Sequence, residues 1–209
     1  MHDSTKKLAL LAILTAMCVA LRIFKIIPVP NVQPVTDILV IVTLNMGFTF
    51  GFALAILTMV VSNIYLGFGI WTISQVLAYG GCVLTVALLA KFTPLKKHFT
   101  YQLVVAVFLG WEYGCFVDFG MSIFGGFNAF LAYWAGSLVF DTYHAVGNLV
   151  FYPILYKPLN VALDHYKRRL LGPSKFIPKS ATKVTPSKSP AKWYLSMTYK
   201  LKHLVTSMN

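Results

Sequence analysis

The chain has 209 residues, of which 57% are hydrophobic and 11% are charged, and its formal net charge is +12 at pH 7. About a quarter of the residues in a soluble domain are usually charged, so this composition excludes an ordinary soluble protein and indicates an integral membrane protein. The positive charge lies where membrane topology alone would place it, so we expect no nucleic-acid partner.

Six apolar segments are candidates for helices that cross the roughly 30 Å of membrane hydrocarbon. They lie near residues 7–24, 36–48, 51–66, 72–91, 100–119 and 132–156. The second and third are close enough that one bent or re-entrant helix fits the sequence equally well. The first runs directly into Arg22 and Lys25, unlike a cleavable signal peptide, so we expect a retained helix. The sequence therefore predicts an all-α bundle of six transmembrane helices.

The distribution of Lys and Arg predicts the orientation of this bundle. If the amino terminus is cytoplasmic, six crossings leave 16 of the 18 basic residues inside and only Arg22 and Lys25 outside. The loops after the third and fifth helices contain no Lys or Arg. We therefore predict that both termini are cytoplasmic.

The composition changes at Gly172, where Pro alternates with Ser, Thr and Lys. Such a stretch cannot bury enough apolar surface to fold alone. We predict a transmembrane domain over 1–171 and a flexible basic linker over 172–192. Residues 193–209 combine aromatic and basic side chains, as is typical of an amphipathic segment lying on membrane lipid.

Polar side chains within the membrane are the best guide to function, because an ionised group at the bilayer centre costs about 2.5–3.5 kcal/mol or more. Most of them lie in the outer half of the predicted bundle, and the inner half is nearly bare. This asymmetry predicts a substrate pocket that opens to the outside. The candidate pocket residues are Asn31, Gln33, Thr36, Asn63, Trp71, Gln75, Tyr79, Trp111, Glu112, Asn128, Tyr133, Asp141 and His144.

Several of these residues share a helical face, which favours a common pocket. Gln75 and Tyr79 are four residues apart, and Asp141 and His144 are three apart. Asp141 and His144 also fit a hydrogen bond that only joins helices, and Glu112 fits a structural acceptor. The aromatic candidates also fit an interfacial belt.

Ala12, Ala16 and Ala20 recur every four residues in the first segment and form a smooth stripe. Such a stripe lets another helix approach closely, either within the chain or from a partner subunit. The three cysteines have unrelated spacings, so we expect neither a disulfide nor a metal site.

Two motifs resemble a known family. Residues 30–36 read PNVQPVT, and residues 62–75 read SNIYLGFGIWTISQ. With the six-helix pattern and the alanine stripe, the chain resembles the substrate-binding S component of an energy-coupling factor (ECF) vitamin transporter, closest to the cobalamin branch. Asp37 stands where that pattern has a small apolar residue.

The resemblance implies a subunit of the bacterial plasma membrane that binds cobalamin from outside and topples to release it inside. It implies that Ala12, Ala16 and Ala20 dock on a transmembrane coupling subunit, which carries two cytoplasmic ATPases. The chain has no phosphate-binding loop motif, so ATP hydrolysis must come from those partners and we expect neither enzyme activity nor a cofactor of its own. A neutral His144 is a possible ligand for the cobalt of cobalamin.

Three alternatives stay open. An S component for pantothenate or a queuosine precursor would pair Arg22 or Lys25 with a carboxylate. An intramembrane enzyme would use Ser137, Asp141 and His144, although Ser137 and His144 lie about 10 Å apart along one helix. A proton-coupled carrier would use the buried acids, although the sequence shows no internal repeat.

Overall fold

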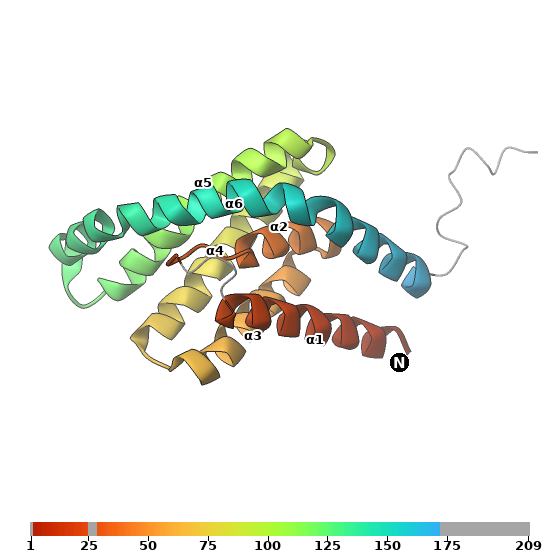
Figure 1. Ribbon diagram of the computed structural model, residues 1–209, viewed down its shortest axis with the longest axis horizontal. Helices are drawn as coiled ribbons and strands as arrows, with labels where there is room; N and C mark the ends of the chain where they lie inside the picture. Colours follow the sequence, from red (N-terminus) through yellow and green to blue (C-terminus); the bar gives the residue numbers. More distant parts are fainter. Residues whose placement is uncertain (1, 25–28, 172–209) are drawn as a thin grey trace, which may run out of the picture. The chain divides into compact units, whose positions relative to one another are not determined.

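The computed structural model describes residues 2–24 and 29–171 (Figure 1). These residues form six α-helices and one short 3-10 helix and contain no β-strand, so the predicted all-α class is confirmed. Contacts divide the chain into two units, Met1–Leu170 and Leu171–Asn209, and the fold described below is that of the first. The predicted linker, 172–192, and the predicted amphipathic segment, 193–209, lie outside the described residues.

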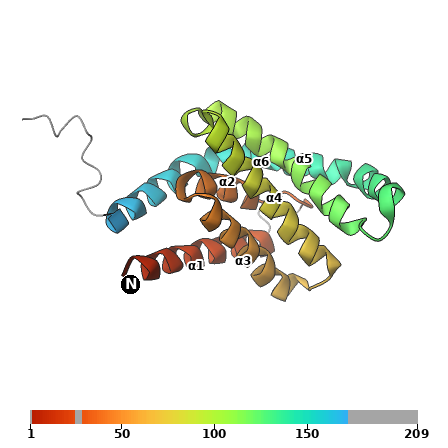
Figure 2. The same ribbon diagram turned by 180° about the vertical axis from the view of Figure 1, so that it is seen from behind.

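The helices follow the predicted order, and the 3-10 helix η1 joins the fourth to the fifth. Their bounds are α1 His2–Ile23, α2 Val35–Met46, α3 Phe48–Leu66, α4 Ile70–Phe92, η1 Leu95–Lys97, α5 Phe99–Met121 and α6 Gly126–Leu171. In both views α4 and α5 run side by side, and α1 lies beside α3 (Figures 1 and 2). We call the end that holds the α3–α4 and α5–α6 connections the predicted outer end, and the opposite end the predicted inner end.

α2 and α3 are separate helices, so the alternative of one bent helix is wrong. Gly47 has φ 91°, a backbone conformation that glycine adopts far more readily than other residues. Its N–H donates to the Thr43 carbonyl at 2.9 Å, which satisfies one of the last carbonyls of α2. The new helix begins at the next residue and turns back through the bundle.

Three of the described helices are long and apolar enough to cross a membrane, namely α3, α4 and α5. α2 is apolar but shorter. These helices support a membrane bundle. The predicted total of six crossings and the cytoplasmic position of both termini stay predictions.

α6 is much longer than the predicted segment 132–156, because it continues for 46 residues through Pro153 and Pro158. Its apolar face does not end at the prolines, since Leu159 and Leu163 beyond them are buried. Packing of this face against the bundle offsets the loss of two backbone N–H donors. The sequence underestimated the helix because polar residues and prolines follow its apolar part.

Two glycines of α5 let α6 approach closely. Gly110 and Gly114 are four residues apart, the spacing of a small-residue packing motif. A Cβ atom at Gly110 would lie 2.5 Å from the backbone nitrogen of Ala145, and one at Gly114 would collide with the Asp141 carboxyl group. This contact fixes how α6 presents its polar face to the bundle.

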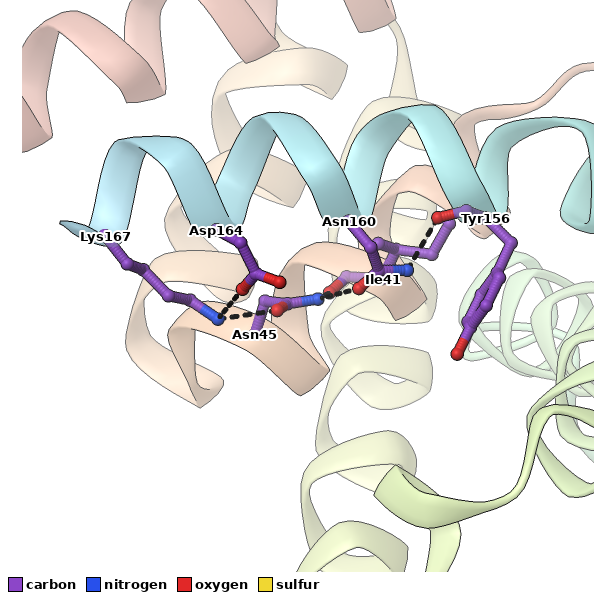
Figure 3. A network of polar contacts seen from close by, with 6 residues as sticks. All are labelled: Ile41, Asn45, Tyr156, Asn160, Asp164 and Lys167. Carbon is purple, nitrogen blue, oxygen red and sulfur yellow. Dashed lines mark hydrogen bonds and ion pairs between the residues drawn. The ribbon is translucent and has the colours of Figure 1, made fainter. Parts of the chain in front are cut away.

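The predicted inner end carries a polar network, whose α6 residues all follow the predicted membrane segment 132–156, so the expectation of a nearly bare inner half of the membrane stays a prediction. Figure 3 shows it between α2 and α6. Lys167 Nζ donates to Asn45 Oδ1 at 2.6 Å and lies 3.6 Å from Asp164 Oδ1, and Asn45 Nδ2 donates to Asn160 Oδ1 at 2.7 Å. The sequence did not indicate this network because all three α6 residues follow the predicted end of the helix.

Replacing Gly110 with Val tests the close packing of α5 and α6. The added atoms would meet the Ala145 backbone, so we expect a lower melting temperature in detergent, equivalent to about 1–3 kcal/mol of stability. Gly136→Val is the matched control, because a Cβ atom at that position of α6 meets no atom within 4 Å. Equal melting temperatures of the two variants would contradict the packing.

Candidate functional site

The first polar cluster at the predicted outer end joins α1, α3 and α4, and we call it the amide cluster. It consists of Arg22, Asn63, Thr72 and Gln75. Arg22 Nη2 donates to Gln75 Oε1 at 3.0 Å and to Asn63 Oδ1 at 3.5 Å. Asn63 Nδ2 donates to Thr72 Oγ1 at 3.0 Å and to Gln75 Oε1 at 3.1 Å. Arg22, Asn63 and Thr72 are buried, so these polar groups depend on one another rather than on water.

The tight connection between α3 and α4 assembles this cluster. Gly67, with φ 97°, ends α3, and its N–H donates to the Asn63 carbonyl at 2.9 Å. Thr72 then closes the first turn of α4, where its hydroxyl accepts the Gly69 N–H at 3.3 Å. The short connection therefore places the side chains of Asn63 and Thr72 within hydrogen-bonding distance.

The second cluster joins α2, α4, α5 and α6, and we call it the tyrosine cluster. It consists of Gln33, Thr36, Tyr79, Tyr113 and His144. Thr36 Oγ1 lies 2.7 Å from His144 Nε2, and Gln33 Nε2 donates to the Tyr79 hydroxyl at 3.3 Å. The Tyr113 ring lies between, with its centroid 4.3 Å from that of Tyr79 and 5.1 Å from that of His144. Four of the five residues were predicted site residues, and Tyr113 was not.

The two clusters are connected through α4. Gln75 and Tyr79 lie one helical turn apart on the same face, as their spacing predicted. Gln75 belongs to the amide cluster and Tyr79 to the tyrosine cluster. The structure therefore brings six of the predicted residues into one contiguous polar region. They are Gln33, Thr36, Asn63, Gln75, Tyr79 and His144.

A third polar group joins α5 to α6. Ser137 Oγ lies 2.6 Å from Asp118 Oδ2 and 2.7 Å from Asp141 Oδ2. Ser137 thus links the carboxyl groups of the two helices. His144 instead contacts Thr36 of α2, so its hydrogen bond joins two helices, as the structural alternative for this residue allowed.

Other predicted residues lie away from these clusters. Glu112 turns toward α4, where it accepts the Thr85 hydroxyl at 2.5 Å. The Trp111 indole N–H donates to the Thr142 hydroxyl at 3.3 Å on the exposed side of α5 and α6. Asn31 is half-buried in the turn before α2, with φ 61°. The exposed members of the predicted set are Trp71, Trp111, Asn128 and Tyr133.

Several buried polar atoms near the tyrosine cluster have no hydrogen-bond partner among the described residues. Both carboxylate oxygens of Asp37 are in this position, as are His144 Nδ1 and Asn148 Oδ1. All three side chains are buried. Water or a solute normally satisfies such atoms, so this region retains unused capacity for hydrogen bonding.

The tyrosine cluster is closed in this structure. The void beside Thr36 and Tyr79 is lined mainly by apolar side chains and has no room for a water-sized sphere. A larger groove of about 420 Å³ lies at the α5–α6 connection. It is lined by Phe119, Ser122, Ile123, Gly126, Phe127 and Phe130. Sequence reasoning missed this groove, although the density of Phe around the connection was a signal.

A family model described as the ECF transporter, substrate-specific component, matches residues 6–156. The chain belongs to this family. Such S components are the substrate-binding subunits of transporters that also contain a membrane coupling subunit and ATPases. The match includes both polar clusters and nearly all of α1 to α5. No curated protein and no solved structure matches the sequence.

Replacing Gln75 with Leu tests the amide cluster of this S component. The change leaves donors of Arg22 and Asn63 without their shared acceptor, so we expect a loss of about 1–3 kcal/mol of stability. Thermal unfolding in detergent measures it. Trp111→Phe is the control, because its lost hydrogen bond lies on an exposed face. Equal destabilisation by the two changes would contradict the assigned network.

Proposed function

We propose that this S component captures cobalamin or a closely related corrinoid from outside the cell for an ATP-driven importer in the bacterial plasma membrane. Membership of the family supports the role of substrate-binding subunit. The choice of a corrinoid is supported by the motifs PNVQPVT and SNIYLGFGIWTISQ, which resemble the cobalamin branch. It is also supported by the chemistry of the clustered residues.

The observation that carries the proposal is that the amide cluster and the tyrosine cluster lie next to each other at one end of the bundle. A corrinoid presents a rim of amide groups around a flat and largely apolar macrocycle. Asn63 and Gln75 both donate and accept hydrogen bonds, as such a rim requires. Tyr79 and Tyr113 provide ring surface beside them. His144 lies in the same cluster, although hydrogen bonding to the rim needs no bond between cobalt and imidazole.

The closed arrangement implies a conformational step before binding. Tyr79 and His144 are fully buried, and the void beside Tyr79 is far smaller than a corrinoid. Helices α4 and α6 must therefore separate at the predicted outer end to admit the ligand. The exposed rings of Phe124 and Phe127 at the α5–α6 connection give the ligand a first apolar surface.

The alanine stripe supports docking on a coupling subunit. Ala12, Ala16 and Ala20 are exposed, whereas Leu14 and Cys18 of the same helix are buried. The stripe therefore lies on a face of α1 that the bundle does not bury. We propose that it packs against the transmembrane coupling subunit, whose two ATPases hydrolyse the ATP.

The alternative of an intramembrane enzyme receives no support from the contacts. Ser137 hydrogen-bonds to carboxyl groups, and His144 hydrogen-bonds to Thr36. His144, which this alternative requires as the base, therefore does not contact the Ser137 hydroxyl that it would have to activate. The S component for pantothenate or a queuosine precursor stays the nearest alternative.

Isothermal titration of the detergent-purified chain tests the choice of solute. We expect saturable binding of cobalamin and no measurable binding of pantothenate, because the clustered residues suit an amide-rimmed macrocycle. Binding of pantothenate without binding of cobalamin would overturn the corrinoid proposal and leave the family assignment intact.

Replacing Ala16 with Trp tests the docking surface. The bulky ring would separate two closely packed helices, so we expect uptake by the reconstituted transporter to fall about tenfold or more, with solute binding to the isolated chain unchanged. Leu77→Trp, at an exposed position of α4, is the control for placing a Trp on the membrane-facing surface. Normal uptake by the Ala16 variant would contradict the proposed docking of the alanine stripe on the coupling subunit.

A further inference from the structure

Arg22 is a buried cation surrounded by neutral groups. It lies in the last turn of α1, and the residue is only 7% exposed. Its guanidinium contacts the oxygens of Asn63 and Gln75 and the sulfur of Met59. None of these groups carries a charge, so the contacts orient the guanidinium without neutralising it.

The acids of the bundle lie elsewhere. Asp164 forms an ion pair with Lys167 at the predicted inner end. Asp118 and Asp141 contact Ser137, and Glu112 contacts Thr85. Asp37 of α2 is buried without a hydrogen-bond partner among the described residues, and it is not one of the groups that Arg22 contacts. A buried charge is costly unless an opposite charge or a full set of hydrogen bonds compensates it. The fold therefore retains an uncompensated positive charge within the amide cluster.

The cluster also has a surplus of donors. A guanidinium has five N–H groups, and the three contacts of Arg22 leave two of them unassigned. Gln75 Oε1 already accepts from both Arg22 and Asn63. An incoming group that satisfies the cluster must therefore accept hydrogen bonds and carry negative charge. Carboxylate and phosphate oxyanions match the guanidinium fork in both respects.

We propose that Arg22 forms a subsite for an oxyanion group of the transported solute, either a carboxylate or a phosphodiester. This inference rests on the proposed function, because it assigns a role within the same substrate site. In cobalamin the group is the phosphodiester that links the corrin side chain to the ribose of the nucleotide. In an acidic solute such as pantothenate it is the carboxylate. Arg22 thus selects for charge, while the neighbouring amides and rings select for shape.

Two pairs of ligands separate this role from a purely structural one. Cobalamin and cobinamide differ in the phosphodiester and its nucleotide, and pantothenate and panthenol differ in the carboxylate. Titration calorimetry on the full chain compares wild type, Arg22→Lys, Arg22→Gln and the charge control Lys91→Gln, whose side chain is exposed at the predicted inner end. Melting temperatures establish that each variant is folded.

We expect Arg22→Gln to weaken binding of the anionic member of the pair about tenfold or more, and that of the neutral member much less. The affinity of Arg22→Lys for the anionic member should lie between those of wild type and Arg22→Gln. Lysine keeps the positive charge but lacks the paired, planar N–H donors of the guanidinium. Lys91→Gln should change the affinity for neither member of the pair. Equal losses for both members would show that Arg22 only supports the fold, and would overturn the inference.

The same titrations separate failure of the inference from failure of the proposed function. If the cobalamin pair does not bind but pantothenate binds in an Arg22-dependent way, the corrinoid proposal is wrong and the oxyanion subsite stands. If the wild-type chain binds neither anion more tightly than its neutral analogue, the subsite is wrong whichever solute is transported.

Discussion

Polar side chains buried in a membrane bundle must be satisfied within the protein, because hydrocarbon offers them no hydrogen bonds. This constraint determines where the helices of the S component meet. Asn63 and Gln75 hold α3 and α4 around Arg22, and Thr36 and His144 hold α2 against α6. In the proposed function the same side chains recognise the solute, so the solute would replace the interactions that close the predicted outer end.

The helices were largely predictable because their causes are local. The length of the apolar segments placed α1 to α5 close to their observed bounds. The length of α6 was not predicted, because its last part depends on packing. Leu159 and Leu163 are buried against the bundle, although two prolines lie within the helix. The polar network around Asn45 and Lys167 follows from that extension. No local pattern in the sequence indicates it.

The site was predictable as a set of residue types on helical faces, and less so as a set of contacts. Spacing placed Gln75 and Tyr79 together, as the structure has them. It did not fix how α5 is rotated, which turns Glu112 toward Thr85 and Trp111 toward Thr142 instead of toward the clusters. Gly110 and Gly114 set that rotation through their contact with α6. This contact cannot be inferred from the sequence, because it depends on the position of α6.

The central feature of the proposed function is a closed polar region at the predicted outer end, which opens to receive the solute. A structure of the full chain with cobalamin bound tests it most directly. We expect the corrin ring against Tyr79 and its amide rim within hydrogen-bonding distance of Gln75, with α4 and α6 farther apart than they are here. A corrinoid seated only in the groove around Phe127, with the amide and tyrosine clusters still closed, would contradict the account.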